Sequence, residues 1–233
     1  MTGPRPPSTV LPVQLLVLAK EPRPGHAKTR LVPALSAQQA SEVARAALLD
    51  TLAAVAAVPV ARRVLVLDGA PDRLPTAGFD VLPQSGGNLN ARLAAAFCDS
   101  WAGTDRWDGT ALPMLLVGMD TPQVTPALLT EAAGLLLCAD GGAVLGCAED
   151  GGWWSLGLLA PLPGAFDGVP MSTGATGAAQ AARLVALGLR PARLPVLRDL
   201  DHVEDIAPIA ADLAEDSALA TLAVSLGLAP VPA

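Results

Sequence analysis

Short apolar runs of strand length alternate with helical segments along this chain of 233 residues, and this alternation restricts its possible folds more than any other feature. Parallel strands must be joined by crossover connections, which are usually helices, so the pattern is typical of a sheet with helices on both faces. The chain is therefore predicted to form one α/β domain around a mostly parallel sheet. The predicted strands are 13–18, 63–67, 79–82, 113–117, 143–147, 153–158 and 194–197, and the predicted helices are 36–58, 89–101, 177–187, 208–213 and one that begins at Pro126.

The ends of the chain are expected to lie outside this domain, which should cover residues 11–225. Residues 1–10, rich in proline and small side chains, are predicted to be a disordered tail, and residues 226–233 are predicted to fray. The apolar stretch near the N-terminus imitates a secretory signal, but Pro12 and Gln14 interrupt it and no cleavage site follows. No run is long enough to span a membrane. We therefore expect a cytoplasmic protein without a membrane partner.

Charge and cysteine content further narrow the range of possible functions. The net charge is −7, aromatic residues are few and tyrosine is absent, which argues against a nucleic-acid-binding surface. Cys98, Cys138 and Cys147 are odd in number and lack paired spacing, so they indicate thiols in a reducing compartment, not disulfides or a zinc site. A small-molecule substrate is the expected partner.

Both lysines of the chain lie in one Pro/Gly-rich loop, 19–31, directly after the first predicted strand. Ligands of open α/β sheets collect at the carboxyl ends of strands, and compact ammonium groups suit phosphates. A solvated turn closed by glycine is the alternative interpretation. The residues predicted to bind the phosphates of a nucleotide are Lys20, Arg23, Gly25, Lys28 and Arg30.

Aspartates follow two other predicted strands. Asp120 lies just beyond the strand 113–117, and Asp199 and Asp201 lie just beyond the strand 194–197. A spacing of two on an extended chain directs both carboxylates to the same side. Magnesium is typically held by one or two carboxylates together with substrate phosphates. These three aspartates are therefore predicted to bind Mg²⁺ or Mn²⁺.

Structural roles compete with these ligand roles. Asp120 could cap the next helix, although Thr125 is better placed as its N-cap. Asp201 and Glu204 have the spacing of a capping box, although Pro208 suggests that the helix begins later.

Motifs at 19–31, 118–122, 148–153, 171–173 and 199–205 follow one another along the chain. Their order resembles that in an uncharacterised bacterial family of GT-A-fold transferases, described as glycosyltransferases or as radical-SAM/selenodomain-associated transferases. The segments 28–31 and 87–91 are also similar to the related 2-phospholactate guanylyltransferases. The resemblance implies a Rossmann-like GT-A domain, the fold of nucleotide-diphospho-sugar transferases, in which the corresponding aspartates hold magnesium. The five motifs are AKEPRPGHAKTRL at 19–31, GMDTP at 118–122, AEDGGW at 148–153, MST at 171–173 and DLDHVED at 199–205.

Three positions depart from the family pattern. Trp153 stands where the family usually has tyrosine, Met171 where it has tryptophan, and His202 with Val203 where it has Thr-Pro. These departures bear on the identity of the acceptor more than on the fold.

Two further groups complete the predicted site, and each has a structural alternative. The predicted base-binding residues could instead form a glycine turn and helix caps, and the predicted acceptor-binding residues could form a Gly-Gly turn and a helix cap. Neighbouring strand residues face opposite sides, so one of two adjacent tryptophans belongs to the core while the other could line the acceptor pocket. The predicted base-binding residues are Gly86, Gly87, Asn88 and Asn90, and the predicted acceptor-binding residues are Asp150, Gly151, Gly152, Ser172 and Thr173. The adjacent tryptophans are Trp153 and Trp154. No role is assigned to His26 or His202.

These elements together favour a magnesium-dependent nucleotidyltransferase that transfers a nucleotide from a nucleoside triphosphate to a small phosphorylated acceptor. Lys28 and Asp120 are the predicted catalytic residues, acting through charge neutralisation. The density of positive charge in the first loop favours a triphosphate over a nucleotide sugar. A glycosyltransferase is the alternative, and a non-catalytic nucleotide-binding protein is the second alternative.

Overall fold

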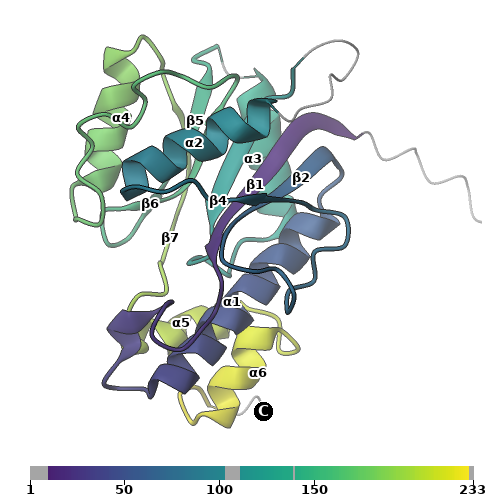
Figure 1. The fold of residues 1–233 in the computed structure, drawn as a ribbon, viewed down its shortest axis with the longest axis vertical. Helices are drawn as coiled ribbons and strands as arrows, with labels where there is room; N and C mark the ends of the chain where they lie inside the picture. The colour runs from purple at the N-terminus through teal and green to yellow at the C-terminus, as the bar shows by residue number, and fades with distance from the viewer. Residues whose placement is uncertain (1–9, 103–110, 139, 231–233) are drawn as a thin grey trace, which may run out of the picture.

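A seven-stranded sheet with the strand order β3-β2-β1-β4-β6-β5-β7 forms the centre of the computed structural model, which describes residues 10–102, 111–138 and 140–230 (Figure 1). β6 runs antiparallel to β4 and β5, and the other pairs are parallel. The predicted α/β fold with a mostly parallel sheet is confirmed. The strands are β1 Leu11–Lys20, β2 Val60–Asp68, β3 Asp80–Pro83, β4 Met114–Gly118, β5 Ala143–Ala148, β6 Trp153–Leu158 and β7 Ala192–Leu197.

Helices cover both faces of the sheet. Along β1, Leu15 and Val17 belong to the core cluster that includes residues of α1 and α3, whereas Leu16 belongs to the cluster with residues of α2 and α4. This alternation follows from the two-residue period of a strand buried on both faces. The helices are α1 Ala37–Ala57, α2 Leu89–Ala102, α3 Pro126–Cys138, α4 Thr176–Ala186, α5 Val203–Asp212 and α6 Ala218–Ser225, with a short 3-10 helix at Thr29–Leu31.

A third cluster, built from α1, α5, α6 and the loop that follows β1, lies below the sheet in Figure 1. Leu31 and Leu200 are fully buried in it, so the loop after β1 and the segment after β7 are both anchored there. Leu226 and Leu228 pack against the same cluster. The rest of the predicted frayed end, 231–233, and residues 1–9 of the predicted tail lie outside the described residues.

Two helices differ from the sequence prediction. The predicted start of a helix at Pro208 is wrong: α5 begins at Val203, because Asp205 accepts a hydrogen bond from the N–H of His202 at 2.8 Å and caps the helix earlier. α6 was not predicted, because its short apolar sequence has no clear period. Its first turn is held from α1, where the Asp50 carboxylate accepts from the N–H groups of Ala218 and Leu219.

Within the described residues, none of the helices combines the length and the apolar character that crossing a membrane requires.

Candidate functional site

A cavity of about 350 Å³ opens at the carboxyl ends of β1 and β4. The chain leaves β1 toward β2 and β3 on one side and returns to β4 on the other, so the order of the strands reverses between these two neighbours. Such a switch point is where open α/β sheets bind ligands. The cavity therefore lies where the fold alone predicts a functional site.

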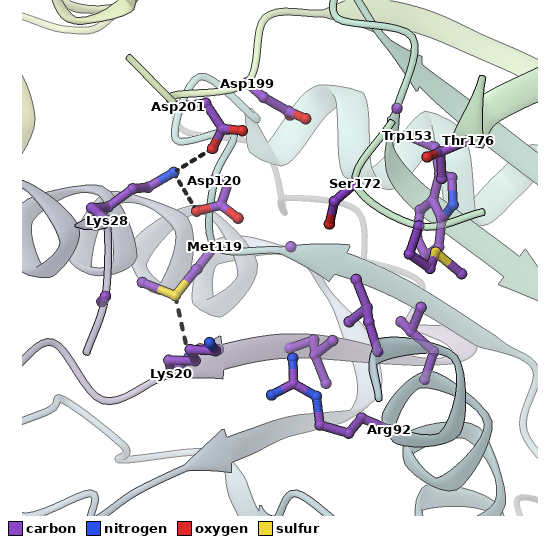
Figure 2. Close-up of a pocket in the computed structure, with 18 of the residues that line it drawn as sticks. Lys20, Lys28, Arg92, Met119, Asp120, Trp153, Ser172, Thr176, Asp199 and Asp201 are labelled. Atoms are coloured by element: carbon purple, nitrogen blue, oxygen red, sulfur yellow. Dashed lines mark hydrogen bonds and ion pairs between the residues drawn. The ribbon is translucent and has the colours of Figure 1, made fainter. Parts of the chain in front are cut away.

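Charged residues from three distant segments line one side of the cavity, and we call this side the charged wall (Figure 2). They come from β1 and the loop after it, from the turn after β4, and from the segment after β7. The backbone N–H of Leu200 donates to the carbonyl of Asp120 at 2.8 Å and so joins the last two segments. The residues of the charged wall are Lys20, Lys28, Arg30, Asp120, Asp199 and Asp201.

The Lys28 ammonium group lies at the centre of the charged wall. Its Nζ is 2.5 Å from Oδ1 of Asp120 and 3.4 Å from Oδ1 of Asp201, and it also donates to the carbonyl of Leu200. The other carboxylate oxygen of Asp201 pairs with Nη1 of Arg30 at 2.5 Å. The Lys28 side chain is only 5% exposed, whereas that of Asp120 is 49% exposed, so water reaches this ion pair from the carboxylate side.

Asp199 is the third acidic residue of this wall. Burial raises the pKa of its carboxyl to about 8, the neighbouring charges of Asp120 and Asp150 add to the rise, and Lys28 opposes it. Burial is the larger cause, and the nearby carboxylates, which only Lys28 offsets, add to it. A bound cation would supply charge of the missing sign.

The donor set of the charged wall fits a magnesium or manganese ion bound together with a phosphate-containing ligand. Oδ1 of Asp120 and Oδ1 of Asp201 both point at Lys28, which shows that two carboxylate oxygens can face one cation. Two carboxylates completed by phosphate oxygens and water are the usual ligands of Mg²⁺. Among the described residues, no group of three or more His, Cys, Asp or Glu side chains is arranged to hold a metal ion. The metal-binding roles of the three aspartates stay predictions.

Helix capping, the alternative role considered for Asp120 and Asp201, is carried out by other residues. Oγ1 of Thr125 accepts from the N–H of Leu128 at 3.1 Å, so Thr125 caps α3 and Asp120 does not. At α5 the capping carboxylate is Asp205, and Glu204 forms no such box with Asp201. The carboxylates of Asp120 and Asp201 are thereby left to the charged wall.

The predicted phosphate-binding residues divide into two groups. Lys20, Lys28 and Arg30 line the cavity, whereas Arg23 and Gly25 do not. Arg23 is more than half exposed and pairs with Glu21 at 3.3 Å. Gly25 has a φ of +74° in the turn before Lys28, so it shapes the loop. Within the described part of the chain the Lys20 ammonium group has no hydrogen-bond or ion-pair partner, which leaves it available to a ligand.

The predicted base-binding residues lie away from the cavity lining. Gly86, Gly87, Asn88 and Asn90 are all absent from it. The side chain of Asn88 accepts from the N–H of Ala91 at 3.0 Å and caps α2. The amide of Asn90 donates to two backbone carbonyls, at 2.6 and 2.9 Å, in the segment before α4. Both asparagines thus have structural partners, and base binding by this loop stays a prediction.

The opposite side of the cavity is formed by the start of β6 and the segment that leads into α4, and we call it the β6–α4 wall. It consists of aromatic, thioether and hydroxyl side chains, several of which are visible in Figure 2. Oγ1 of Thr176 accepts from the N–H of Thr173 at 3.1 Å and so orders this segment. The residues of the β6–α4 wall are Trp153, Met171, Ser172, Thr173 and Thr176.

The predicted acceptor-binding residues are found at or beside this wall. Asp150, Gly152, Ser172 and Thr173 line the cavity, and Gly151 does not. Oδ1 of Asp150 accepts from the N–H of Gly152 at 2.7 Å, so the Gly-Gly turn and the cavity use the same residue. Gly151 packs against Gly174, where a Cβ would lie 2.1 Å from the carbonyl oxygen. Its role is close backbone packing.

The two tryptophans have separate environments. Trp154 is 1% exposed and donates from Nε1 to the carbonyl of Pro195 at 2.9 Å, so it is the core residue of the pair. Trp153 lines the cavity. His202 is the N-cap residue of α5, and His26 lies 3.6 Å from Oδ2 of Asp68 at the cavity edge.

Arg92 is a cavity residue that the sequence analysis did not identify. It lies in the first turn of α2, its side chain is 19% exposed, and its nearest carboxylate oxygen, on Asp68, is 3.7 Å away. A cation in the first turn opposes the helix dipole, so its position in the sequence was an available signal. The side chain extends toward the cavity from below the charged wall (Figure 2).

Comparison with known proteins agrees with this fold. Residues 51–173, more than half of the chain, match the family described as "uncharacterized protein conserved in bacteria (DUF2064)", so the chain belongs to the DUF2064 family. No match was found among curated proteins.

Three solved structures are similar over nearly the whole chain. A nucleotide-diphospho-sugar transferase assigned as putative, from Desulfovibrio desulfuricans, is 21% identical with a TM-score of 0.78, covering 94% of this chain and 99% of that one. A Mycobacterium homologue of M. tuberculosis Rv0371c is 20% identical (TM-score 0.53, 93% and 99% covered). A cytidylyltransferase from Leptospira borgpetersenii is 13% identical (TM-score 0.54, 93% and 94% covered). At these identities the similarity establishes the nucleotide-diphospho-sugar transferase fold.

Proposed function

We propose that this protein is a magnesium- or manganese-dependent nucleotidyltransferase that joins a nucleotide, taken from a nucleoside triphosphate, to a small phosphorylated acceptor. The observation that carries the proposal is the convergence of Lys28, Asp120 and Asp201 at the strand-order switch point. Beside them lies the ammonium group of Lys20, which has no partner among the described residues. Cations and carboxylates mixed at one cavity wall suit a ligand that carries both phosphates and a divalent metal.

The chain's own residues would act by binding and orienting the phosphates. Asp120 and Asp201, with Asp199 beside them, would hold the metal, which when bound neutralises phosphate charge and polarises the α-phosphoryl group. Lys20 and Lys28 would bind the phosphates that depart, where negative charge is greatest.

The proposed transfer needs no general base. An oxygen of the acceptor phosphate attacks the α-phosphorus, the bond from the α-phosphorus to the bridging oxygen breaks, and pyrophosphate leaves. The attacking oxygen is already anionic, so no side chain has to remove a proton. Asp150, Ser172 and Thr173 stand on the side of the cavity from which the acceptor would approach.

A glycosyltransferase is the second candidate. The carboxylate of Asp150 and the hydroxyls of Ser172 and Thr173 line the cavity together, and such groups also suit the hydroxyls of a sugar. In that case the donor would be a nucleotide sugar and the released product a nucleoside diphosphate. A nucleotide-binding protein without turnover is the third candidate, recognised by tight nucleotide binding with no product.

Product analysis separates these candidates. The protein is incubated with Mg²⁺, each common ribonucleoside triphosphate and a panel of small phosphorylated acids and sugars, and pyrophosphate is measured. We expect acceptor-dependent pyrophosphate release that is lost in Asp120→Asn. Release of a nucleoside diphosphate from nucleotide sugars, with no pyrophosphate from any triphosphate, would instead support the glycosyltransferase.

A further inference from the structure

The Lys28 ammonium group occupies the point at which two carboxylates of the charged wall converge. It contacts one oxygen of Asp120 and one oxygen of Asp201 (Figure 2). The carbonyl of Leu200 accepts its third contact. An ammonium group has three N–H donors, so these partners use all of them. In this state Lys28 has no donor left for a phosphate.

The backbone fixes this position. Lys28 has a φ of +52°, in the left-handed region that residues with a side chain seldom adopt. Ala27 before it is 5% exposed, and Leu31, at the end of the short helix that follows, is fully buried. Because the loop is anchored in the core on both sides of Lys28, the fold fixes where the side chain leaves the backbone. The contacts of the ammonium group with the carboxylates are therefore a built feature of the loop.

A divalent cation at the same two carboxylate oxygens would meet the ammonium group. The two positive charges could not share these oxygens, because each needs the same lone pairs and they repel at short range. Arg30 already neutralises the second oxygen of Asp201. A metal bound by these two oxygens therefore requires that Lys28 leave its place.

We infer that the Lys28 ammonium group holds the divalent-cation position in the nucleotide-free protein, so that the metal enters as a complex with the triphosphate, whose phosphates receive the displaced ammonium group. This inference rests on the proposed function, since it concerns the order in which the ligands of that site bind. Metal alone has to displace Lys28 without offering it a new partner. The metal–triphosphate complex offers phosphate oxygens in exchange, so metal and nucleotide bind with positive coupling.

The first test measures Mn²⁺ binding by electron paramagnetic resonance without nucleotide. Lys28→Met keeps the length of the side chain and removes the charge, and it should bind Mn²⁺ more tightly than the wild type, on the order of tenfold. Lys20→Met is the matched control, because Lys20 contacts none of these carboxylates, and it should leave Mn²⁺ affinity unchanged. Equal or weaker Mn²⁺ binding by a folded Lys28→Met variant would overturn the inference.

The second test uses the wild-type protein and does not depend on the folding of a variant. The chain contains only the lysines Lys20 and Lys28, so an amine-acylating reagent followed by mass spectrometry reports on each separately. Saturating Mn²⁺ should accelerate acylation of Lys28 several-fold and leave Lys20 unchanged, and adding a non-hydrolysable triphosphate should then protect Lys28. Acylation of Lys28 that does not respond to Mn²⁺ would contradict the inference.

Neither test uses turnover, so the two proposals can fail separately. Pyrophosphate release with no response of Lys28 to Mn²⁺ would remove only this inference. A Mn²⁺-dependent response of Lys28 without pyrophosphate release would keep the inference for a nucleotide-binding protein and remove the nucleotidyltransferase.

Discussion

The two walls of the cavity differ in how their chemistry is assembled. In the charged wall, Lys28 forms ion pairs with Asp120 and Asp201, residues that are far from it in the sequence. In the β6–α4 wall, Trp153 and Met171 offer apolar surface, and Ser172 and Thr173 offer hydroxyls. The first arrangement suits the part of a substrate that does not vary, and the second suits the part that distinguishes one acceptor from another.

The departures from the family pattern agree with this division. The lining residues of the charged wall match the resembled family, and the departure at His202 and Val203, beside Asp201, lies outside the cavity lining. Trp153 and Met171, by contrast, replace the family's usual residues in the lining of the other wall. Changes in the charged wall should therefore affect nucleotide and metal binding, and changes in the β6–α4 wall should affect the acceptor alone.

Removal of a carboxylate from the charged wall should have the largest effect. Asp120→Asn and Asp201→Asn each take away one metal ligand, and we expect magnesium-dependent triphosphate binding to weaken roughly a hundredfold, or about 2.7 kcal/mol. Calorimetry with and without Mg²⁺ measures this. Asp150→Asn is the comparison variant: its carboxylate is not a proposed metal ligand and acts on this wall only through its charge beside Asp199, so it should change this binding much less. If all three variants bound the metal–triphosphate complex equally well, the two walls would not differ as described.

Removal of the Lys28 charge should have the next largest effect. One charge-assisted bond to phosphate contributes on the order of 1.5–3 kcal/mol, so Lys28→Ala should raise the dissociation constant of a triphosphate roughly ten- to a hundredfold. Binding of the corresponding nucleoside should change little. Equal losses for both ligands would mean that the loop shapes the cavity without holding phosphate.

Truncation of Trp153 should affect the other wall. A large apolar side chain contributes about 1.5–3 kcal/mol when it is covered, so Trp153→Ala should raise the KM of the acceptor roughly tenfold or more, and Trp153→Phe should raise it less. The dissociation constant of the metal–triphosphate complex should stay the same. An equal loss of nucleotide affinity would show that the two walls act as one binding surface.

Removal of either of two helix-capping aspartates should have the smallest effect. Asp205 accepts from the N–H groups of Asp201 and His202, and Asp50 does the same for Ala218 and Leu219. Asp205→Ala and Asp50→Ala should each lower the free energy of unfolding by about 1 kcal/mol, measured by urea denaturation.

Only one of these caps lies beside the charged wall. Because Asp205 holds the backbone of Asp201, Asp205→Ala should also weaken Mn²⁺–triphosphate binding a few-fold, while Asp50→Ala should not. Identical nucleotide affinities in the two variants would show that the α5 cap does not position the metal ligand.

The sequence alone was sufficient to predict the sheet and the charged residues at its edge. Strand runs such as 13–18 and 113–117 are strongly apolar, and ligand-binding residues of an open sheet have to follow such strands. Asp120, Asp199 and Asp201 could be found in this way. Their pairing with Lys28 could not, because it depends on how the loop after β1 is anchored in the third core cluster.

Three other features of the structure could not be predicted because their local sequence signals are weak. Pro208 suggested a later helix start, yet the Asp205 carboxylate caps α5 earlier. Asn88 and Asn90 follow a Gly-Gly loop and were predicted to bind the nucleotide base, but their side chains have backbone partners. The position of Arg92 in the cavity depends on the packing of α2 against the sheet, which a single sequence does not reveal.

A crystal structure of the protein with Mn²⁺ and a non-hydrolysable triphosphate tests the assignment of the charged wall most directly, since the anomalous signal locates the metal. We predict one Mn²⁺ ion bound by Asp120, Asp201 and phosphate oxygens, with the Lys28 ammonium group moved from the carboxylates to the phosphates. Mn²⁺ bound elsewhere, or phosphates bound away from Lys20 and Lys28 while Lys28 remains paired with Asp120, would contradict the assignment.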